Sequence, residues 1–151
     1  MEKELEPRRA ARRRRQGGFT LIEMLAVVVI LAIVAGVGFV VVNNQIEKAR
    51  VNTDIANLRT IGDAVNRYIM DNGSAPSSMA DLVGKYLGSE PKDPWANSSY
   101  TLNVTQPNNN TPGNVTVQSP HTYTSQPPNT STSGSTGLIY SDGTLKLVVN
   151  F

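Results

Sequence analysis

Residues 19–42 read FTLIEMLAVVVILAIVAGVGFVVV, and this stretch decides how the N-terminal part of the chain folds. Its 24 residues are apolar or small except for Thr20 and Glu23. A helix rises about 1.5 Å per residue, so the stretch reaches ~36 Å. The hydrocarbon core of a bilayer is about 30 Å thick. The stretch therefore predicts one helix that spans a membrane.

The residues before this stretch are polar and basic, and they include four consecutive arginines from Arg12 to Arg15. The positive-inside rule keeps this end in the cytoplasm and sends the C-terminal bulk outside. Seven basic against three acidic residues give residues 1–18 a net charge of +4. Subtracting this from the chain's +2 leaves −2 on residues 19–151. The basic charge thus belongs to the N-terminal segment, and no direct nucleic-acid site is predicted.

The position of a cleavage site depends on the kind of signal. An ordinary secretory signal is cut after its apolar region, beside small residues. Gly36 and Gly38 could form such a site, but the apolar core before them, residues 19–35, then has 17 residues. The usual length is about 7–15. We therefore favour a cut before the apolar region, after Gly18, where two consecutive glycines let the backbone extend into a protease cleft.

The junction Gln16-Gly17-Gly18-Phe19-Thr20-Leu21-Ile22-Glu23, with its basic leader and unbroken apolar helix, resembles the class III signal of type IV pilins and type II secretion pseudopilins. The resemblance implies that a prepilin peptidase cuts between Gly18 and Phe19 and methylates the new amino group of Phe19. It further implies a homo-oligomeric helical filament built on an inner-membrane assembly platform. The precursor is then expected in the cytoplasmic membrane, and the mature protein in an extracellular filament or at the cell surface.

Glu23 places a carboxylate inside the apolar helix, which costs about 2.5–3.5 kcal/mol on insertion scales. One interpretation is that Glu23, close to the helix end, simply reaches the membrane interface. The other is that Glu23 pairs with the free amine of Phe19 on a neighbouring subunit, so that charge neutralisation selects one axial register. The resemblance implies this pairing role for the fifth residue after the cut.

Two glycines, Gly36 and Gly38, interrupt the apolar half of the helix. Each weakens a helix by about 1 kcal/mol relative to alanine. They permit close helix–helix approach in the membrane, or they mark a segment that unwinds when the subunit leaves the lipid for the filament.

Helical periodicity continues beyond the apolar stretch. Charged residues such as Asp54 are predicted on the solvent faces, and Asn72-Gly73 followed by Pro76 predicts the helix end near Asp71. Apolar residues at mostly three- or four-residue steps predict one amphipathic face, namely Ile46, Val51, Ile55, Leu58, Ile61, Val65, Tyr68 and Ile69. The predicted organisation is a cleaved leader at 1–18, an apolar helix at 19–42, an amphipathic helix at 43–71 and a head at 72–151.

The head is predicted to be a small antiparallel β-sheet packed on the long helix, which makes the fold class α+β. We expect a short helix at 79–86, strands at 98–104 and 114–118, and a polar loop at about 105–137 whose part from 119 is exposed. Residues 138–140 and 145–151 predict a hairpin around Asp142-Gly143. Trp95 follows Lys92-Asp93-Pro94, a segment that resembles pilins and the major pseudopilin, and is expected to pack where helix and sheet meet.

Few residues in the head suggest catalysis or the binding of a cofactor or metal. The single histidine, His121, is expected to be exposed in a polar loop, and no catalytic cluster or phosphate-binding loop is recognisable, so we predict no enzyme, no cofactor and no metal. Major pseudopilins often bind calcium in a late acidic loop, but Asp142 is the only carboxylate near that place and calcium takes several oxygen ligands. Sequons make glycosylation a hypothesis at five positions, Asn97, Asn103, Asn109, Asn114 and Asn129.

Three functions remain open from the sequence. The first is a subunit of a surface type IV pilus, and the second is a pseudopilin of a type II secretion system. The third is a monomeric, membrane-anchored surface protein whose polar head binds a ligand. The segment Asp93-Pro94-Trp95 favours the pseudopilin. The uncharged loop and the missing calcium ligands favour the surface pilus, which is the preferred prediction, although the lack of cysteine argues against a disulfide-closed adhesive loop.

Overall fold

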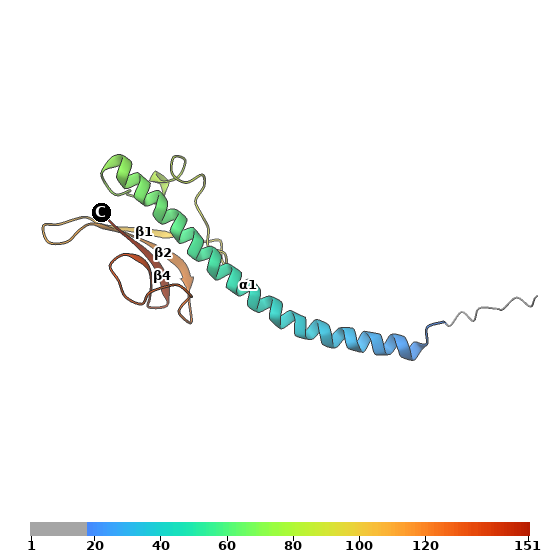
Figure 1. The fold of residues 1–151 in the computed structure, drawn as a ribbon. Coiled ribbons are helices and arrows are strands. Elements are labelled where there is room, and N and C mark those ends of the chain that lie inside the picture. Colours follow the sequence, from blue (N-terminus) through green and yellow to red (C-terminus); the bar gives the residue numbers. More distant parts are fainter. Residues whose placement is uncertain (1–17) are drawn as a thin grey trace, which may run out of the picture. The chain divides into compact units, whose positions relative to one another are not determined.

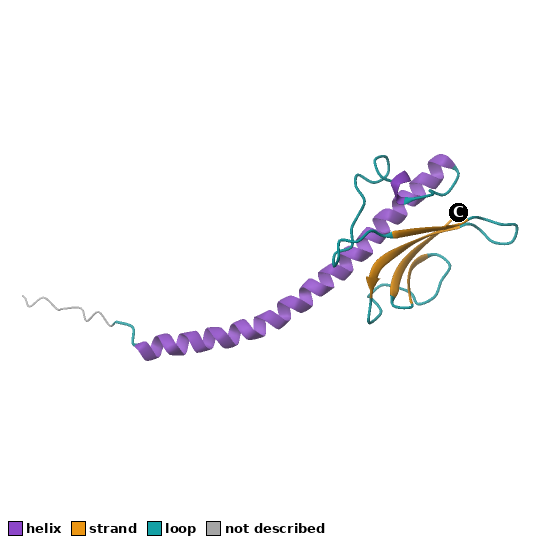
Figure 2. Ribbon diagram, turned by 180° about the vertical axis from the view of Figure 1, so that it is seen from behind, coloured by secondary structure: helices purple, strands orange, loops and turns teal. Residues whose placement is uncertain are grey.

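A long helix, α1, runs from Leu21 to Asn72 in the computed structural model, which describes residues 18–151. Figure 2 shows it as the long purple ribbon. The predicted bounds, 19 and 71, differ from the observed ones by two residues and one residue. Gly73 ends the helix as predicted, because it adopts a φ of +67° and donates its N–H to the carbonyl of Ile69 at 2.8 Å.

The chain divides into two compact units after Val42. In the first unit, every described residue from Gly18 onward is exposed in the isolated chain, including Phe19, whose exposed fraction is 81%. By length and composition, this part of α1 is apolar enough to cross a membrane. Such a continuous apolar surface calls for lipid or other helices around it.

Four antiparallel strands form one sheet in the order β1-β2-β4-β3. Figure 1 shows part of the second half of α1 running along this sheet. The predicted fold class, α+β with a long N-terminal helix and a small antiparallel sheet, is confirmed. The strands are β1 at Thr101–Thr105, β2 at Asn114–Thr122, β3 at Gly137–Ser141 and β4 at Thr144–Asn150.

The predicted hairpin is confirmed by the pairing of β3 with β4. Ser141 pairs with Thr144 across a two-residue turn. Asp142 and Gly143 both adopt positive φ values, +54° and +73°. This geometry matches the twist of the flanking strands, and it explains why Asp-Gly stands at the turn.

Helix and sheet meet in a close-packed core. Leu58, Ile61 and Val65 of α1 are fully buried, as are Val115 and Val117 of β2. Gly62 of α1 faces β4, where a Cβ atom would lie 2.0 Å from Cδ2 of Leu147. The glycine therefore permits a close approach that a side chain would disturb.

Three predictions for the head are wrong in extent. Helix 79–86 is only a single turn, η1 at Met79–Asp81, capped by Asp81, whose carboxylate accepts the backbone N–H groups of Ser77 and Ser78. Gly84, at a φ of +98°, turns the chain away and donates its N–H to the carbonyl of Leu87. Strand 114–118 instead continues to Thr122, and the strand expected at 98–104 begins at Thr101.

The prediction for His121 is wrong, because this residue lies in β2 and is half-buried. Its ring stacks on Trp95 with a centroid distance of 3.7 Å and an interplanar angle of 6°. The ring of Tyr123 meets both edge-on, at 5.8 Å from Trp95 and 4.8 Å from His121. Trp95 also donates its indole N–H to the carboxylate of Glu47 at 3.0 and 3.1 Å. Its predicted packing between helix and sheet is thus confirmed.

Asp54, expected on a solvent face, is instead fully buried. Its two carboxylate oxygens accept hydrogen bonds from the hydroxyl groups of Tyr100 and Tyr123. Asn57 donates to the Tyr100 hydroxyl at 3.1 Å and to the Lys92 carbonyl at 3.0 Å. The helix is therefore joined to two loops of the head through a buried polar network, in which the tyrosines satisfy the carboxylate.

These two tyrosines make the stability of the head sensitive to alkaline pH. Burial, and then the hydrogen bond to Asp54, raise the pKa of both Tyr100 and Tyr123 above the ordinary value of 10.0. In the unfolded chain both phenols ionise near that value, whereas the folded chain still holds the protons. The unfolded state thus binds fewer protons, and the free energy of unfolding should fall as pH rises beyond about 10.

Urea unfolding of the full chain in detergent, followed by Trp95 fluorescence from about pH 8 to about pH 11, measures this dependence. The variant Tyr123→Phe removes one of the two groups and should show a shallower decline. A free energy of unfolding that stays constant across this range would contradict the expectation.

Candidate processing and assembly site

The cleavage junction lies just before α1. Gly18 and Phe19 have no regular secondary structure and are exposed. A Cβ atom at Gly18 would meet nothing within 4 Å, so the packing of the isolated subunit gives no reason for a glycine there. The reason is expected to lie in the protease cleft, where an extended, unsubstituted backbone fits best. Gly17, the other predicted recognition residue, lies outside the described residues.

Thr20 and Glu23 form a capping box at the start of α1. The backbone N–H of Thr20 donates to Oε2 of Glu23 at 2.7 Å, and the Thr20 hydroxyl donates to the same oxygen at 2.9 Å. In return, the N–H of Glu23 donates to Oγ1 of Thr20 at 3.3 Å. Each side chain thereby satisfies a free backbone donor of the first turn.

Sequence reasoning missed the role of Thr20. The pattern Thr-x-x-Glu before an apolar run is a known signature of a helix start, and it could have revealed this pair. The box also adds a third explanation for Glu23, beside the two given above, because a helix cap is useful in the isolated subunit.

The capping box leaves half of the Glu23 carboxylate available. Both bonds from Thr20 go to Oε2, and Oε1 accepts no hydrogen bond from any residue in the range 18–151. A carboxylate can accept about four hydrogen bonds, so a cation can bind at Oε1 without breaking the cap. Capping and pairing with a neighbour's amine are therefore compatible roles.

Gly36 and Gly38 lie within α1, which is helical through both positions. A Cβ atom at either glycine would meet nothing within 4 Å outside the helix. The isolated subunit thus gives no packing reason for them. Close approach of a second helix, or unwinding during assembly, stays a prediction.

A family model matches this same N-terminal segment. The model described as "Prokaryotic N-terminal methylation motif" covers residues 13–39. The match includes the Gly18–Phe19 junction, the capping box and both helix glycines.

The curated relatives extend the likeness into the head. Type II secretion system core protein G of Pseudomonas aeruginosa is 35% identical over 102 residues, covering 56% of this chain and 72% of the relative. The chain belongs to the type II secretion system core protein G family. The protein of the same description from Vibrio cholerae is 34% identical over 107 residues, covering 59% of this chain and 72% of the relative. No solved structure gave a significant match.

Membership of the core protein G family confirms the resemblance to pilins and pseudopilins. It also favours the second of the three functions predicted from the sequence, the secretion pseudopilin, over the surface pilus that we preferred. The features that favoured the pilus, an uncharged loop and few calcium ligands, describe one region of the head. The family relationship rests on a much longer part of the chain.

The calcium site described for major pseudopilins does not fit this member of the family. No acidic residue lies between Pro94 and Ser141. In the hairpin turn, Asp142 accepts a hydrogen bond from the Ser141 hydroxyl at 2.8 Å. One carboxylate cannot supply the six to eight oxygens that calcium usually takes.

The five sequons named above occupy surface positions for the most part, and sequence reasoning missed a sixth, Asn72-Gly73-Ser74, which is exposed at the end of α1. The side chains of Asn97, Asn103, Asn109 and Asn129 are exposed, whereas Asn114, the first residue of β2, is half-buried. Asn97 and Asn129 also adopt positive φ values, which places both at turns. Exposure is necessary for glycan attachment but does not demonstrate it, so glycosylation stays a prediction.

Proposed function

We propose that this chain is the pseudopilin subunit of a type II secretion filament, made as a membrane-anchored precursor. Two observations carry the proposal: the likeness to core protein G of Pseudomonas aeruginosa, which is 35% identical and covered to 72% of its length, and the methylation motif at residues 13–39. Assembly of many copies through α1 covers the apolar surface that is exposed in the isolated chain.

Processing and assembly are proposed to follow the arrangement at the start of α1. A prepilin peptidase cuts after Gly18 and methylates the amino group of Phe19. In the filament, this new amine meets Oε1 of Glu23 on a neighbouring subunit. The free oxygen and the exposed junction support this step.

The role is proposed to be structural and not enzymatic. The fold supplies a helix for assembly and a polar head, and the buried carboxylate of Asp54 serves to hold the helix to the head. The expected partners are further copies of the chain, the peptidase and an inner-membrane assembly platform. The mature subunit is expected outside the cytoplasmic membrane, in the filament.

Deletion of the gene in the native strain tests the secretion function. If the chain is a pseudopilin, the proteins that the system exports should fall at least tenfold in the culture medium and accumulate inside the cells. Surface pili and surface motility should remain at wild-type levels, and a plasmid copy should restore export. Normal export with loss of surface pili would instead establish the pilus function and contradict the proposal.

A further inference from the structure

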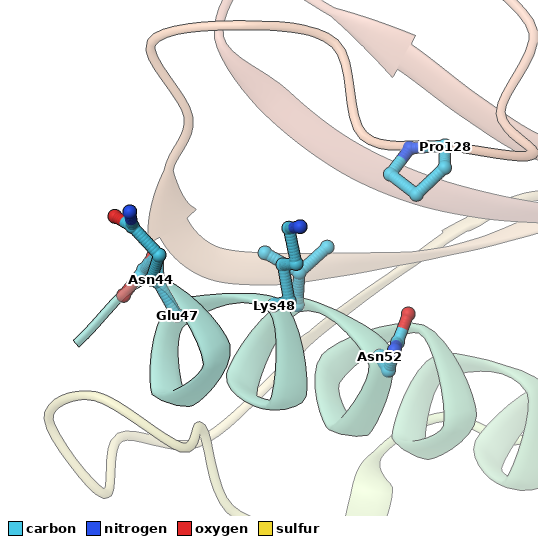
Figure 3. Close-up of a pocket in the computed structure, with 6 residues that line it drawn as sticks. Asn44, Glu47, Lys48, Asn52 and Pro128 are labelled. Atoms are coloured by element: carbon cyan, nitrogen blue, oxygen red, sulfur yellow. The ribbon is translucent and has the colours of Figure 1, made fainter. Parts of the chain in front are cut away.

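A groove of about 530 Å³ runs between α1 and the loop after β2, within the second unit of the chain. Asn44, Lys48 and Asn52 recur at four-residue steps and so lie on one face of the helix. Figure 3 shows this face opposite the ring of Pro128. The full lining consists of Asn44, Glu47, Lys48, Val51, Asn52 and Pro128.

The two charged side chains in the groove differ in whether they have a partner. Glu47 accepts the indole N–H of Trp95 and lies 3.9 Å from Arg50. Lys48, by contrast, has no carboxylate within 4.0 Å among residues 18–151. Its ammonium group and the side-chain amides of Asn44 and Asn52 are hydrogen-bond donors, and together they suit an anion with several oxygens, such as a phosphate.

The position of the groove along the chain indicates that the phosphate belongs to a lipid headgroup. The apolar stretch ends at Val42, and Lys48 follows six residues later in the same helix. At about 1.5 Å per residue, this is ~9 Å of helix. The polar layers of a bilayer add about 5–8 Å on each side of the hydrocarbon core. A lysine side chain at this point therefore reaches the headgroup layer.

The residues beside the groove also suit the membrane surface. A second hollow shares Glu47, Val51 and Pro128 with the groove and is lined further by His121 and Tyr123. Trp95 stacks on His121 and meets Tyr123 edge-on. Tryptophan is enriched where membranes meet water, because its ring combines an apolar body with a polar end, and Trp95 is only half-buried, whereas Tyr123 is buried.

We propose that this groove binds the headgroup of a membrane phospholipid, with the phosphate at Nζ of Lys48 and the amides of Asn44 and Asn52 as further donors. The contact holds the head against the outer surface of the membrane before assembly. It requires neither cleavage after Gly18 nor a filament, and so it can fail while the proposed secretion function stands. It rests on the chain being membrane-anchored.

Native mass spectrometry of the full chain in detergent, with phosphatidylethanolamine added, tests this site. The wild-type chain should retain one phospholipid, and Lys48→Gln should lower the retained fraction about tenfold, since it removes one hydrogen bond between a charged donor and the phosphate. Arg59→Gln is the matched control, because it removes a cation from the same helix outside the groove. It should retain the lipid as the wild type does.

Several outcomes would overturn the proposal. Equal retention by Lys48→Gln and the wild type would show that the groove does not hold the phosphate. Equal retention of monogalactosyl diacylglycerol, which has no phosphate, would show that only the acyl chains bind. Retention of inorganic phosphate without any retained phospholipid would assign the groove to a free anion, and a dimer lost in Lys48→Gln would assign it to a second copy.

Trp95 gives a second measurement in vesicles. A phosphatidylcholine that carries a nitroxide on its headgroup should quench Trp95 fluorescence in the reconstituted wild-type chain. Because Trp95 is the only tryptophan and donates its indole N–H to Glu47 of the groove, the signal reports on the region beside the groove. Lys48→Gln should reduce the quenching relative to Arg59→Gln, and equal quenching in the two variants would contradict the lipid contact.

Discussion

Glu23→Ala is expected to reduce filament yield at least tenfold while synthesis, membrane insertion and cleavage after Gly18 continue. The variant removes the carboxylate that we expect to meet the Phe19 amine of a neighbouring subunit. A charge left without its partner in an apolar bundle is destabilised by several kcal/mol, and this penalty recurs at every subunit. The yield can be measured as the sheared filament fraction, and processing as the mass of the cellular protein.

Two further variants distinguish the two roles of Glu23, pairing with the Phe19 amine of a neighbour and capping α1. Glu23→Gln keeps an oxygen that can accept the bonds from Thr20 but removes the charge. Thr20→Ala removes the cap partner and keeps the charge, at a cost of about 1 kcal/mol to the helix. If pairing is the role of Glu23, Glu23→Gln should assemble as poorly as Glu23→Ala, and Thr20→Ala should assemble well. The reverse pattern would show that Glu23 matters only as a cap.

Asp54→Ala should destabilise the head by about 2–6 kcal/mol, because two buried tyrosine hydroxyls lose their acceptor and each unsatisfied group costs about 1–3 kcal/mol. Asp63→Ala is the matched control. It replaces the same residue type on the same helix, but at an exposed position, where changes usually stay within about 0.5 kcal/mol.

Urea unfolding of the full chain in detergent, followed by Trp95 fluorescence, measures both variants. Native proteins typically have a free energy of unfolding of about 5–15 kcal/mol. If this protein lies at the low end of that range, Asp54→Ala should remove most of its stability. Equal midpoints for the two variants would mean that the buried network contributes nothing to stability.

Strong periodic signals in the sequence predicted the helix and the terminal hairpin well. The end of α1 follows from Gly73, since glycine readily adopts the left-handed conformation found there. Asp142-Gly143 likewise predicts its own turn. In both cases the information is local, so neighbouring residues suffice to specify the structure.

Contacts between distant residues could not be predicted in this way. Asp54 has the charge of a surface residue, and only the approach of Tyr100 and Tyr123, which are 46 and 69 residues away, makes its burial possible. His121 lies in a run of polar residues in β2, and its stacking depends on Trp95 from a distant loop. Such pairs depend on the completed fold, which periodicity does not describe.

The candidate assembly site could be predicted only in part from the sequence. The junction at Gly18 and Phe19 and the acid at Glu23 were recognisable from the motif, because the residues are adjacent in sequence. The partner proposed for Glu23 belongs to another copy of the chain, so neither the sequence pattern nor the isolated subunit specifies it. The choice between pilus and secretion filament required comparison with the core protein G relatives.

The mass of the N-terminal peptide from the assembled subunit tests the processing and assembly scheme most directly. Filaments sheared from cells that overproduce the chain are digested, and the first peptide is measured. We expect a peptide that begins at Phe19 and carries one methyl group on its amine. An assembled subunit that still carries the arginine-rich residues 1–18 would contradict the scheme, since no free amine would then exist beside Glu23.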